Sequence, residues 1–534
     1  MSRPQPLWRL LAPLSALAIA LGCDPATKAK DSAAHLKVLH LSGESDVPTL
    51  DPAIGYDTDS WTFEQEIFDT LVRYGDSSVD LEPDVALDWS VSPDATVFTF
   101  HLRRDAAFTN GRPVTSADFK YAIERSLSPA TRSKGGEYYR GIVGAADFIA
   151  GGAKDLCGIE TPDPYTIVFR LQKPDPIFAH KLAMPFAAAV PHEVIEQWGE
   201  DFSAHAVGSG PFKLREWISG QRIVLDRNPA YFVKDKPRVD SIEYLVGVSQ
   251  ELQWLKYEAG EVDVVGPAPA IAPAEFPYIF KTPRLRALVE HNVTVTTDYL
   301  GMNCQMPPFD DLRVRRAFNY AVNKRKLVAV INGRGVIAHG VLPPGLPGFN
   351  PDLKGYRYDP AAARALLDAA GVHNFAPVMW VRSDQTALMM AESIQQDLAL
   401  VGVRVVLKPI AWGPLLEAIR QPKTVALFML AWEADFPDPQ NFLEVLLSRE
   451  QWGSNNDAFY DNPKVDALLR EAAPVADLNK RYELYRKAEE LVVADAPWVF
   501  LFNPVSYTIR QPWVGGYRLN PLRPARLESI SISR

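Results

Sequence analysis

The chain has 534 residues, 47% of them hydrophobic and 23% charged, which is enough for two or three domains with separate cores. Its net charge of −9 and the absence of a basic run argue against nucleic-acid binding. Its three cysteines have no short spacing and form no metal or redox motif. We expect the two internal ones, Cys157 and Cys304, to be unpaired.

The N-terminal segment has the features of a secretory signal. Arg3 and Arg9 precede an apolar run from Leu10 to Leu21, which is short for a membrane span. Cys23 follows a small residue and resembles the acylation site of bacterial lipoproteins, where the cysteine carries palmitate and becomes the new N-terminus. The alternative is a plain secreted protein with an unrelated cysteine. Cleavage after residue 22 removes the two arginines and changes the net charge from −9 to −11.

The segment after this cysteine has no apolar period, so residues 23–35 are predicted to be a lipid-anchored linker. No later apolar run approaches the length of a membrane span. We therefore expect a periplasmic or extracytoplasmic protein that is soluble apart from its lipid anchor in the cell membrane.

The first predicted elements are a strand over 36–41 and a helix that Ser60 can cap. This helix is expected to bury one face, made of Phe63, Ile67, Phe68 and Leu71. Alternation predicts a half-buried strand over 97–102, and a second strand over 165–171 repeats its pattern. Each of these two strands follows Pro-Asp, and we expect both in one small sheet.

Helix signals follow in the rest of the chain. Thr115 and Asp118 form a capping box that opens a helix. One helix is predicted over 311–332 and another from Asp359-Pro360 to Gly371. A further helix ends near Gly402 and leads into an alternating strand at 403–407. Helices and strands that alternate in both halves of the chain predict an α/β protein.

Catalytic and cofactor motifs are missing from the sequence. Gly208-Ser-Gly-Pro-Phe212 lacks the glycine that a nucleophile elbow has two residues before its serine. His192-Glu-Val-Ile-Glu196 has no second histidine and cannot be a zinc-protease helix. No phosphate-binding or dinucleotide-binding loop is present. We therefore predict that the protein is not an enzyme and needs no metal or cofactor.

The run from Leu430 to Leu443 is the most informative stretch. Its Phe-Pro-Asp-Pro sequence cannot continue a helix or a central strand, so the chain turns there. Asp435 lies among aromatic residues that include Trp432, and a carboxylate beside an aromatic wall suits an organic ammonium. The alternative is that Asp435 only shapes the turn.

Five segments, in order, resemble the oligopeptide- and dipeptide-binding proteins of bacterial ABC transporters, which form extracytoplasmic solute-binding protein family 5. The likeness covers nearly all of the chain after residue 36. The segments are Pro48-Thr-Leu-Asp-Pro52; Ala86 to Asp94 with Phe98 to Arg103, Phe108 to Gly111 and Ala117 to Phe119; Val207 to Phe212 with Arg227 to Tyr231 and Gly260 to Asp263; Pro307 to Phe318; and the run around Asp435 with Asp495 to Trp498.

This resemblance implies a two-lobed periplasmic-binding-protein fold of type II, with an extra subdomain inserted in the first lobe. Its lobes are joined by two crossover strands and close on the ligand like a hinge. Residues 1–22 are then the signal peptide. The implied boundaries are 36–82, 207–268 and 508–534 for lobe I, 83–206 for the inserted subdomain, and 269–507 for lobe II.

The resemblance also implies a set of ligand contacts. Asp435 corresponds to the residue that pairs with the α-ammonium of a peptide, and Trp432 lines the neighbouring wall or is a core residue. Arg382 lies near the position of an arginine that binds the ligand carboxylate; the alternative is a solvated surface arginine. Ser209 faces the cleft or belongs to a tight structural turn.

We therefore expect a monomeric receptor that captures extended peptides and delivers them to membrane permease subunits. In this family the peptide is bound largely through its main chain, in hydrated pockets. The alternative with the same fold is a non-peptide solute, such as a metal chelate or an oligosaccharide. A periplasmic hydrolase would need a nucleophile that is not visible, and a sensory or chaperone-like module without transport is a further alternative.

Overall fold

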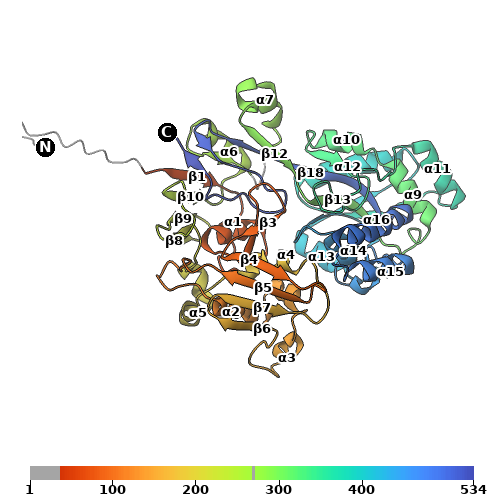
Figure 1. Ribbon diagram of the computed structural model, residues 1–534. Helices are drawn as coiled ribbons and strands as arrows, with labels where there is room; N and C mark the ends of the chain where they lie inside the picture. The colour runs from red at the N-terminus through yellow and green to blue at the C-terminus, as the bar shows by residue number, and fades with distance from the viewer. Residues whose placement is uncertain (1–35, 267–270) are drawn as a thin grey trace, which may run out of the picture. The chain divides into compact units, whose positions relative to one another are not determined.

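The computed structural model of the protein describes residues 36–266 and 271–534, and helices alternate with strands along the chain, as the α/β prediction requires (Figure 1). The lipidation predicted at Cys23 lies outside these residues. Within the described ranges, no helix has the length and apolar character needed to cross a membrane. Cys157 and Cys304 are both free thiols, as predicted.

The first sheet has four strands in the order β1-β10-β9-β8. These strands are β1 (Val38–Ser42), β8 (Phe212–Ile218), β9 (Arg222–Arg227) and β10 (Ser241–Leu245). Strand β1 runs parallel to β10, whereas β10, β9 and β8 pair antiparallel. The strand predicted over 36–41 is therefore confirmed as β1, and its register with β10 aligns Leu39 with Ile242 in the core.

Helix α1 (Thr58–Ile67) packs near this sheet, but it begins earlier than predicted. Its N-cap is Asp57, whose carboxylate accepts a hydrogen bond from the Ser60 amide at 2.8 Å. The prediction of Ser60 as the N-cap is wrong. Asp57 and Ser60 are both good capping residues and lie three positions apart, and Asp57 occupies the N-cap position. Phe68 and Leu71 are buried as expected, although both follow the end of the helix.

The second sheet has the order β4-β5-β7-β6 and is antiparallel throughout. It consists of β4 (Ala86–Val91), β5 (Val97–Leu102), β6 (Ile159–Asp163) and β7 (Thr166–Arg170). The pairing of β5 with β7 confirms that the two strands with repeated patterns share one small sheet. Phe98 lies opposite Phe169 in this pairing.

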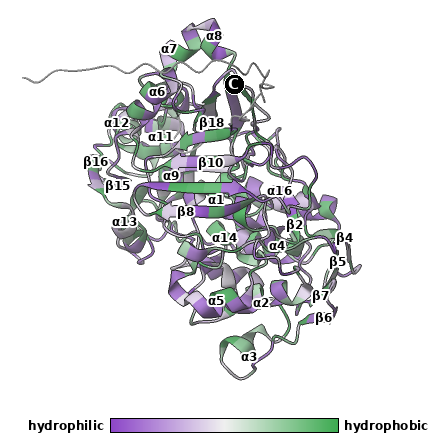
Figure 2. Ribbon diagram, turned by 90° about the vertical axis from the view of Figure 1, so that its left-hand side faces the viewer, coloured by the Kyte–Doolittle hydropathy of each residue, from purple (hydrophilic) through white to green (hydrophobic). Residues whose placement is uncertain are grey.

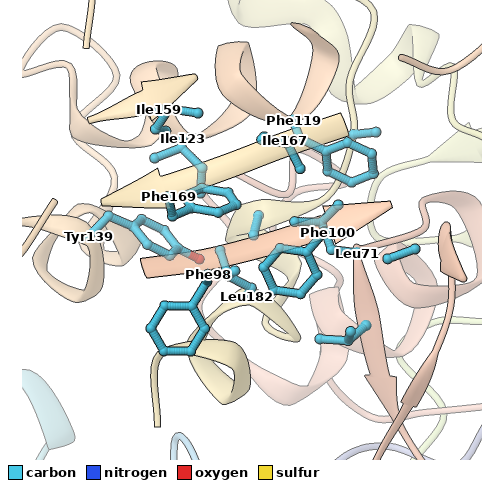
Figure 3. Close-up of a cluster of buried hydrophobic side chains, with 14 of the residues drawn as sticks. Leu71, Phe98, Phe100, Phe119, Ile123, Tyr139, Ile159, Ile167, Phe169 and Leu182 are labelled. Atoms are coloured by element: carbon cyan, nitrogen blue, oxygen red, sulfur yellow. The ribbon is translucent and has the colours of Figure 1, made fainter. Parts of the chain in front are cut away.

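Helix α2 (Ser116–Leu127) covers this sheet and begins with the predicted capping box, in which the Thr115 amide donates to Asp118 at 2.8 Å. Its ribbon changes between hydrophilic and hydrophobic colours along its length, as expected for a helix with one buried face (Figure 2). Phe119 and Ile123 on this face join Phe98, Phe100 and Phe169 in a buried cluster (Figure 3).

The third sheet has eight strands, and its longest strand is β18. Its members are β11 (Val264–Val265), β12 (Val289–Val293), β13 (Thr296–Met302), β14 (Gly335–Ile337), β15 (Val378–Arg382), β16 (Val406–Ile410), β17 (Leu427–Glu433) and β18 (Trp498–Arg510). Strand β18 pairs with β13 through its first half and with β12 and β11 through its second half. Strand β18 therefore connects, by strand pairing, segments that lie far apart in the sequence.

The helices around this sheet correct two predictions. The single helix expected over 311–332 is two helices, α9 (Leu312–Ala321) and α10 (Lys324–Val330), because Asn323 caps the second one. Helix α11 (Pro360–Ala369) is confirmed. Helix α12 (Gln385–Ala399) precedes β16, which begins at Val406 rather than at 403.

The remaining elements of the described residues are two further strand pairs, the other α-helices and four 3-10 helices. The strands are β2 (Val72–Tyr74) paired with β3 (Leu81–Pro83), and β19 (Val514–Gly515) paired with β20 (Ser531–Ile532). The helices are α3 (Ala145–Ile149), α4 (Phe178–Leu182), α5 (His192–Trp198), α6 (Gln250–Glu258), α7 (Phe276–Lys281), α8 (Pro283–Arg286), α13 (Trp412–Ile419), α14 (Gln440–Leu447), α15 (Pro463–Ala472) and α16 (Leu478–Asp495). The 3-10 turns are η1 (Lys134–Tyr139), η2 (Pro185–Ala187), η3 (Gly199–His205) and η4 (Arg449–Gln451).

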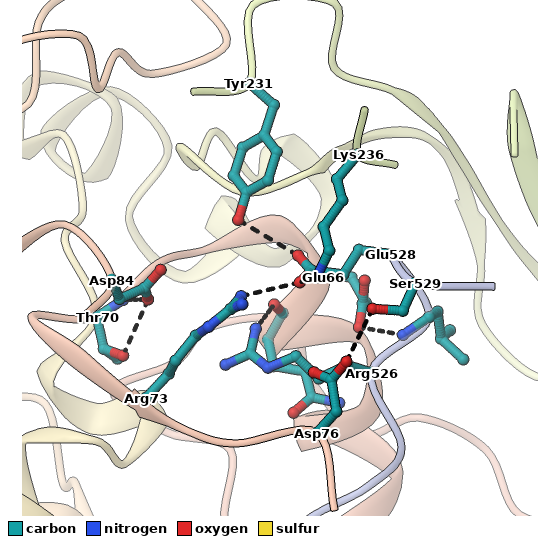
Figure 4. Close-up of polar contacts among 12 residues, drawn as sticks. Glu66, Thr70, Arg73, Asp76, Asp84, Tyr231, Lys236, Arg526, Glu528 and Ser529 are labelled. Atoms are coloured by element: carbon teal, nitrogen blue, oxygen red, sulfur yellow. Dashed lines mark hydrogen bonds and ion pairs between the residues drawn. The ribbon is translucent and has the colours of Figure 1, made fainter. Parts of the chain in front are cut away.

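A buried ionic cluster fastens the C-terminal segment to the first part of the chain (Figure 4). The fully buried carboxylate of Glu528 pairs with Arg73 and with Lys236, each at 2.8 Å. Tyr231 donates a further hydrogen bond at 3.3 Å. Burial acts to raise the pKa of Glu528, but the positive charges of Arg73, Arg526 and Lys236 outweigh burial and hold the pKa below its ordinary value.

Candidate ligand-binding site

A cavity of about 690 Å³ contains the predicted residues Asp435 and Trp432 in its wall. Its wall also takes Tyr56 from the segment before α1, Tyr138 from η1 and Tyr299 from β13. This volume lies in the range of small-ligand sites in proteins. The cavity therefore brings together side chains from parts of the chain that are hundreds of residues apart.

Asn441 joins the two predicted residues. Strand β17 ends at Glu433, and the chain then turns before α14, which places Asp435 in the turn. The Asn441 side-chain oxygen accepts hydrogen bonds from the Trp432 indole at 2.9 Å and from the Asp435 amide at 3.0 Å. Its amide nitrogen donates to the Asp435 carboxylate at 3.2 Å. The carboxylate is therefore held in a fixed direction.

A buried ion pair stabilises the rest of the turn. The Arg481 guanidinium donates to both carboxylate oxygens of Asp438, at 2.9 and 3.1 Å, and both side chains are almost completely buried. A bidentate pair of this kind fixes geometry as well as charge. The two prolines on either side of Asp438 are buried as well. The ion pair and the buried prolines therefore fix the conformation of the turn and the position of Asp435.

Two tyrosines face the carboxylate from the first part of the chain. The Tyr56 hydroxyl donates to Asp435 at 2.7 Å and lies 3.1 Å from the Tyr138 hydroxyl. Burial, together with the negative charge of Asp435, raises the pKa of both tyrosines well above the ordinary value. Both phenols therefore remain neutral donors beside the carboxylate.

Aromatic rings surround this polar centre. The Phe436 ring lies edge-on to Tyr138 with 6.2 Å between ring centroids. The Lys181 amine lies 5.6 Å from the Phe436 ring. A smaller cavity of about 140 Å³ shares Tyr56 and Asp435 with the larger one, and its wall adds Glu433 and Arg523. A carboxylate with aromatic neighbours can bind an organic cation.

Comparison with known proteins assigns the chain to a family. Residues 80–454 match the bacterial extracellular solute-binding proteins, family 5. The chain belongs to this family. The resemblance inferred from the five sequence segments is thereby confirmed, and with it the α/β, two-lobed periplasmic-binding-protein fold.

Two curated relatives and one solved structure illustrate the range of family 5. The periplasmic oligopeptide-binding protein OppA of Escherichia coli is 30% identical, over 95% of this chain and 94% of its own. The heme-binding protein A of Haemophilus influenzae is 28% identical over 88% and 87%. The structure of the clavulanic acid biosynthesis oligopeptide binding protein 2 matches with a TM-score of 0.84 and 27% identity, over 93% and 95%. Proteins similar to this chain are thus named for different ligands.

The other two predicted site residues do not line the cavity around Asp435. Arg382 ends β15, is about half exposed and forms an ion pair with Asp384 at 3.0 Å. It also lies 5.3 Å from the ring of Trp412, which does line the cavity. Ser209 is 1% exposed, and a Cβ atom on the preceding Gly208 would lie 1.9 Å from the Ile67 carbonyl oxygen. That contact favours a tight structural turn at Ser209.

Sequence reasoning missed Tyr56, Tyr138 and Asn441. Asn441 stands six residues after Asp435, a spacing that carries no recognisable motif. Tyr56 and Asp435 are 379 residues apart, and only the fold brings them together. A tyrosine one residue before an N-cap gives no signal in a single sequence.

Proposed function

We propose that this protein is the substrate-binding component of a peptide ABC transporter and that Asp435 binds the free α-ammonium of an extended peptide. The observation that carries the proposal is the orientation of Asp435, whose carboxylate lines a ligand-sized cavity and is fixed by Asn441 and Tyr56. An ionised carboxylate offers about four acceptor positions. Two hydrogen bonds are made within the protein, so room remains for an ammonium group.

Transport by such a receptor depends on closure of the two lobes around the ligand. We propose lobe I as residues 36–82, 207–268 and 508–534, the inserted subdomain as 83–206, and lobe II as 269–507. The second sheet falls entirely within the proposed subdomain. With these boundaries the chain crosses between the lobes at residues 268/269 and again within β18, at residues 507/508. Binding involves no reaction of the ligand, and the protein is not an enzyme.

The surroundings of the receptor follow from the same proposal. Acylation of Cys23 anchors a monomer to the cell membrane outside the cytoplasm, through the linker of residues 23–35. The bound peptide is delivered to permease subunits in that membrane. The apolar run before Cys23 and the periplasmic relative support this placement.

A second candidate is a non-peptide solute bound in the same fold. The name of the heme-binding relative is the observation that favours it. Such a ligand has no need for an ammonium anchor, so Asp435→Asn leaves its affinity unchanged. Peptide binding requires that the same substitution weakens binding.

Mass spectrometry of ligand released from natively purified protein tests the proposal directly. The expected result is a mixture of short peptides with free N-termini. Release of a porphyrin, a sugar or a metal chelate in stoichiometric amount contradicts peptide binding and leaves the fold assignment intact.

A further inference from the structure

Arg523 connects the C-terminal segment of the chain with the turn that carries Asp435. It lies between β19 and β20, and its guanidinium donates a hydrogen bond to the main-chain carbonyl oxygen of Asp435 at 2.5 Å. A hydrogen bond from a charged donor is stronger than one between neutral groups. With the proposed boundaries Arg523 belongs to lobe I and Asp435 to lobe II, so this contact joins the two lobes.

The guanidinium of Arg523 is held by two aromatic rings. Its central carbon lies 4.4 Å from the centre of the Trp61 ring and 5.6 Å from the centre of the Tyr74 ring. Both aromatic side chains are buried, and both belong to the proposed lobe I. Arginine packs well on aromatic rings because its charge is delocalised over a plane. The rings therefore restrict the directions in which the guanidinium can donate.

The main chain around Arg523 is fixed as well. The Asn520 side-chain oxygen accepts hydrogen bonds from the amides of Leu522 and Arg523, at 2.8 and 2.9 Å. The Asn520 side-chain nitrogen donates to the carbonyl oxygens of Gly75 and Ser78, each at 2.8 Å. Both acceptors lie in the turn between β2 and β3. Arg523 thus extends from a well-supported part of the proposed lobe I.

Arg523 can influence an ammonium at Asp435 in two opposite ways. It lines the smaller cavity of about 140 Å³ together with Asp435 and Glu433, and its positive charge there repels a ligand ammonium. Its hydrogen bond to the carbonyl of Asp435 fixes the turn, which favours ammonium binding. The two effects change the affinity in opposite directions, so the sign of the change on removal of Arg523 decides between them.

We propose that Arg523 is a positioning residue, which orients the Asp435 turn so that the Asp435 carboxylate meets the α-ammonium of the ligand. The proposal rests on the proposed function, because it names a further residue on which the same ammonium contact depends. Asn441 accepts from the amide of Asp435 and Arg523 donates to its carbonyl, so both main-chain polar groups of Asp435 are held. Arg523 needs no contact with the ligand for this role.

Calorimetric titration of the mature protein with trialanine and N-acetyl-trialanine tests the proposal. Arg523→Met keeps an unbranched side chain between the rings and removes the donor and the charge. It is expected to weaken trialanine binding by about 3- to 10-fold and to leave N-acetyl-trialanine, which has no ammonium, unaffected. Arg523→Lys keeps a charge and a donor and is expected to lose less affinity than Arg523→Met. Arg518→Met, at an exposed arginine of the same segment, is the matched control and is expected to bind trialanine as wild type does.

A doubly substituted protein separates positioning from a general structural role. If Arg523 acts through Asp435, then Arg523→Met changes the affinity for trialanine by less than about twofold in the Asp435→Asn background. An equal loss in both backgrounds, or an equal loss for N-acetyl-trialanine, overturns the proposal. Unchanged or tighter binding of trialanine by Arg523→Met overturns it as well, and so does an Arg523→Lys variant that binds no better than Arg523→Met.

Failure of this inference can be separated from failure of the proposed function. If Asp435→Asn weakens trialanine binding and Arg523→Met does not, the ammonium site stands and the positioning role is wrong. If wild-type protein binds trialanine no more tightly than N-acetyl-trialanine, the ammonium contact itself fails, and the inference fails with it.

Discussion

The carboxylate of Asp435 is held by neutral donors on both of its oxygens. Tyr56 donates to one oxygen and Asn441 to the other. Neither of these donors carries a charge, and the Arg523 guanidinium donates to the main-chain carbonyl oxygen of Asp435 rather than to its carboxylate. An incoming ammonium can then add a charge-assisted hydrogen bond, which is roughly twice as strong as a neutral one.

Tyr56→Phe is expected to weaken binding of trialanine by about two- to tenfold, because it removes one hydrogen bond that orients Asp435. Tyr138→Phe is expected to have a smaller effect, since the Tyr138 hydroxyl lies against Tyr56. Titration calorimetry on both variants measures the difference. Tighter binding by Tyr56→Phe would mean that the phenol competes with the ligand for the carboxylate.

At the scale of single residues, local chemistry made the turn at Asp435 predictable and left the hydrogen-bond partners of its carboxylate unpredictable; its contact with a ligand ammonium stays a prediction. Phe-Pro-Asp-Pro forces a turn that presents Asp435, whatever the rest of the fold. The role of Tyr56 depends on a contact between distant segments. The carboxylate contact expected of Arg382 stays a prediction.

At the scale of elements, alternation and capping signals located several helices and strands, among them β5, β7, α2 and α11. The Phe-rich strands β5 and β7 pair as expected because their apolar faces share one core. The helical pattern over 311–332 failed at Asn323, which is polar enough to end one helix and start the next. Its side chain accepts from the Lys326 amide at 3.1 Å, and its own amide donates to Asp397 at 2.9 Å.

Asn323→Ala is expected to lower the free energy of unfolding by about 1 kcal/mol, because α10 loses its N-cap. Chemical denaturation of the variant and wild type measures this change. Asn479→Ala, an exposed position in the first turn of α16, serves as the control and is expected to be nearly neutral. Equal stability of Asn323→Ala and wild type would show that the break between α9 and α10 is set by packing alone.

At the scale of the whole molecule, separate cores lie on the three main sheets, and buried ionic contacts connect distant segments. Glu528, near the C-terminus, is paired with Arg73 from β2 and with Lys236 from the loop before β10 (Figure 4). A sequence pattern cannot reveal such a contact, because each of these charged residues, taken alone, is expected to lie on the surface.

Glu528→Gln is expected to destabilise the protein by about 3–5 kcal/mol at pH 7, because Arg73 and Lys236 lose their buried partner. The pKa of Glu528 is lowered on folding, so its stabilising contribution is complete above the ordinary glutamate pKa and is lost as the pH falls. The difference between variant and wild type should therefore shrink from pH 7 to pH 3.5 in denaturant titrations.

The exposed pair of Glu160 and Arg170 provides a matched control for this experiment. Both side chains are about half exposed, so Glu160→Gln is expected to change stability little at either pH. A difference for Glu528→Gln that stays constant with pH would contradict the assignment of a lowered pKa.

The affinity of Asp435→Asn for trialanine tests the central claim most directly. The substitution keeps the shape of the side chain and removes its charge. We predict that trialanine binds the variant about 10- to 100-fold more weakly than wild type, and that N-acetyl-trialanine binds both proteins equally weakly. Equal affinity of wild type and Asp435→Asn for trialanine would contradict the account, since one carboxylate and one ligand amine are its basis.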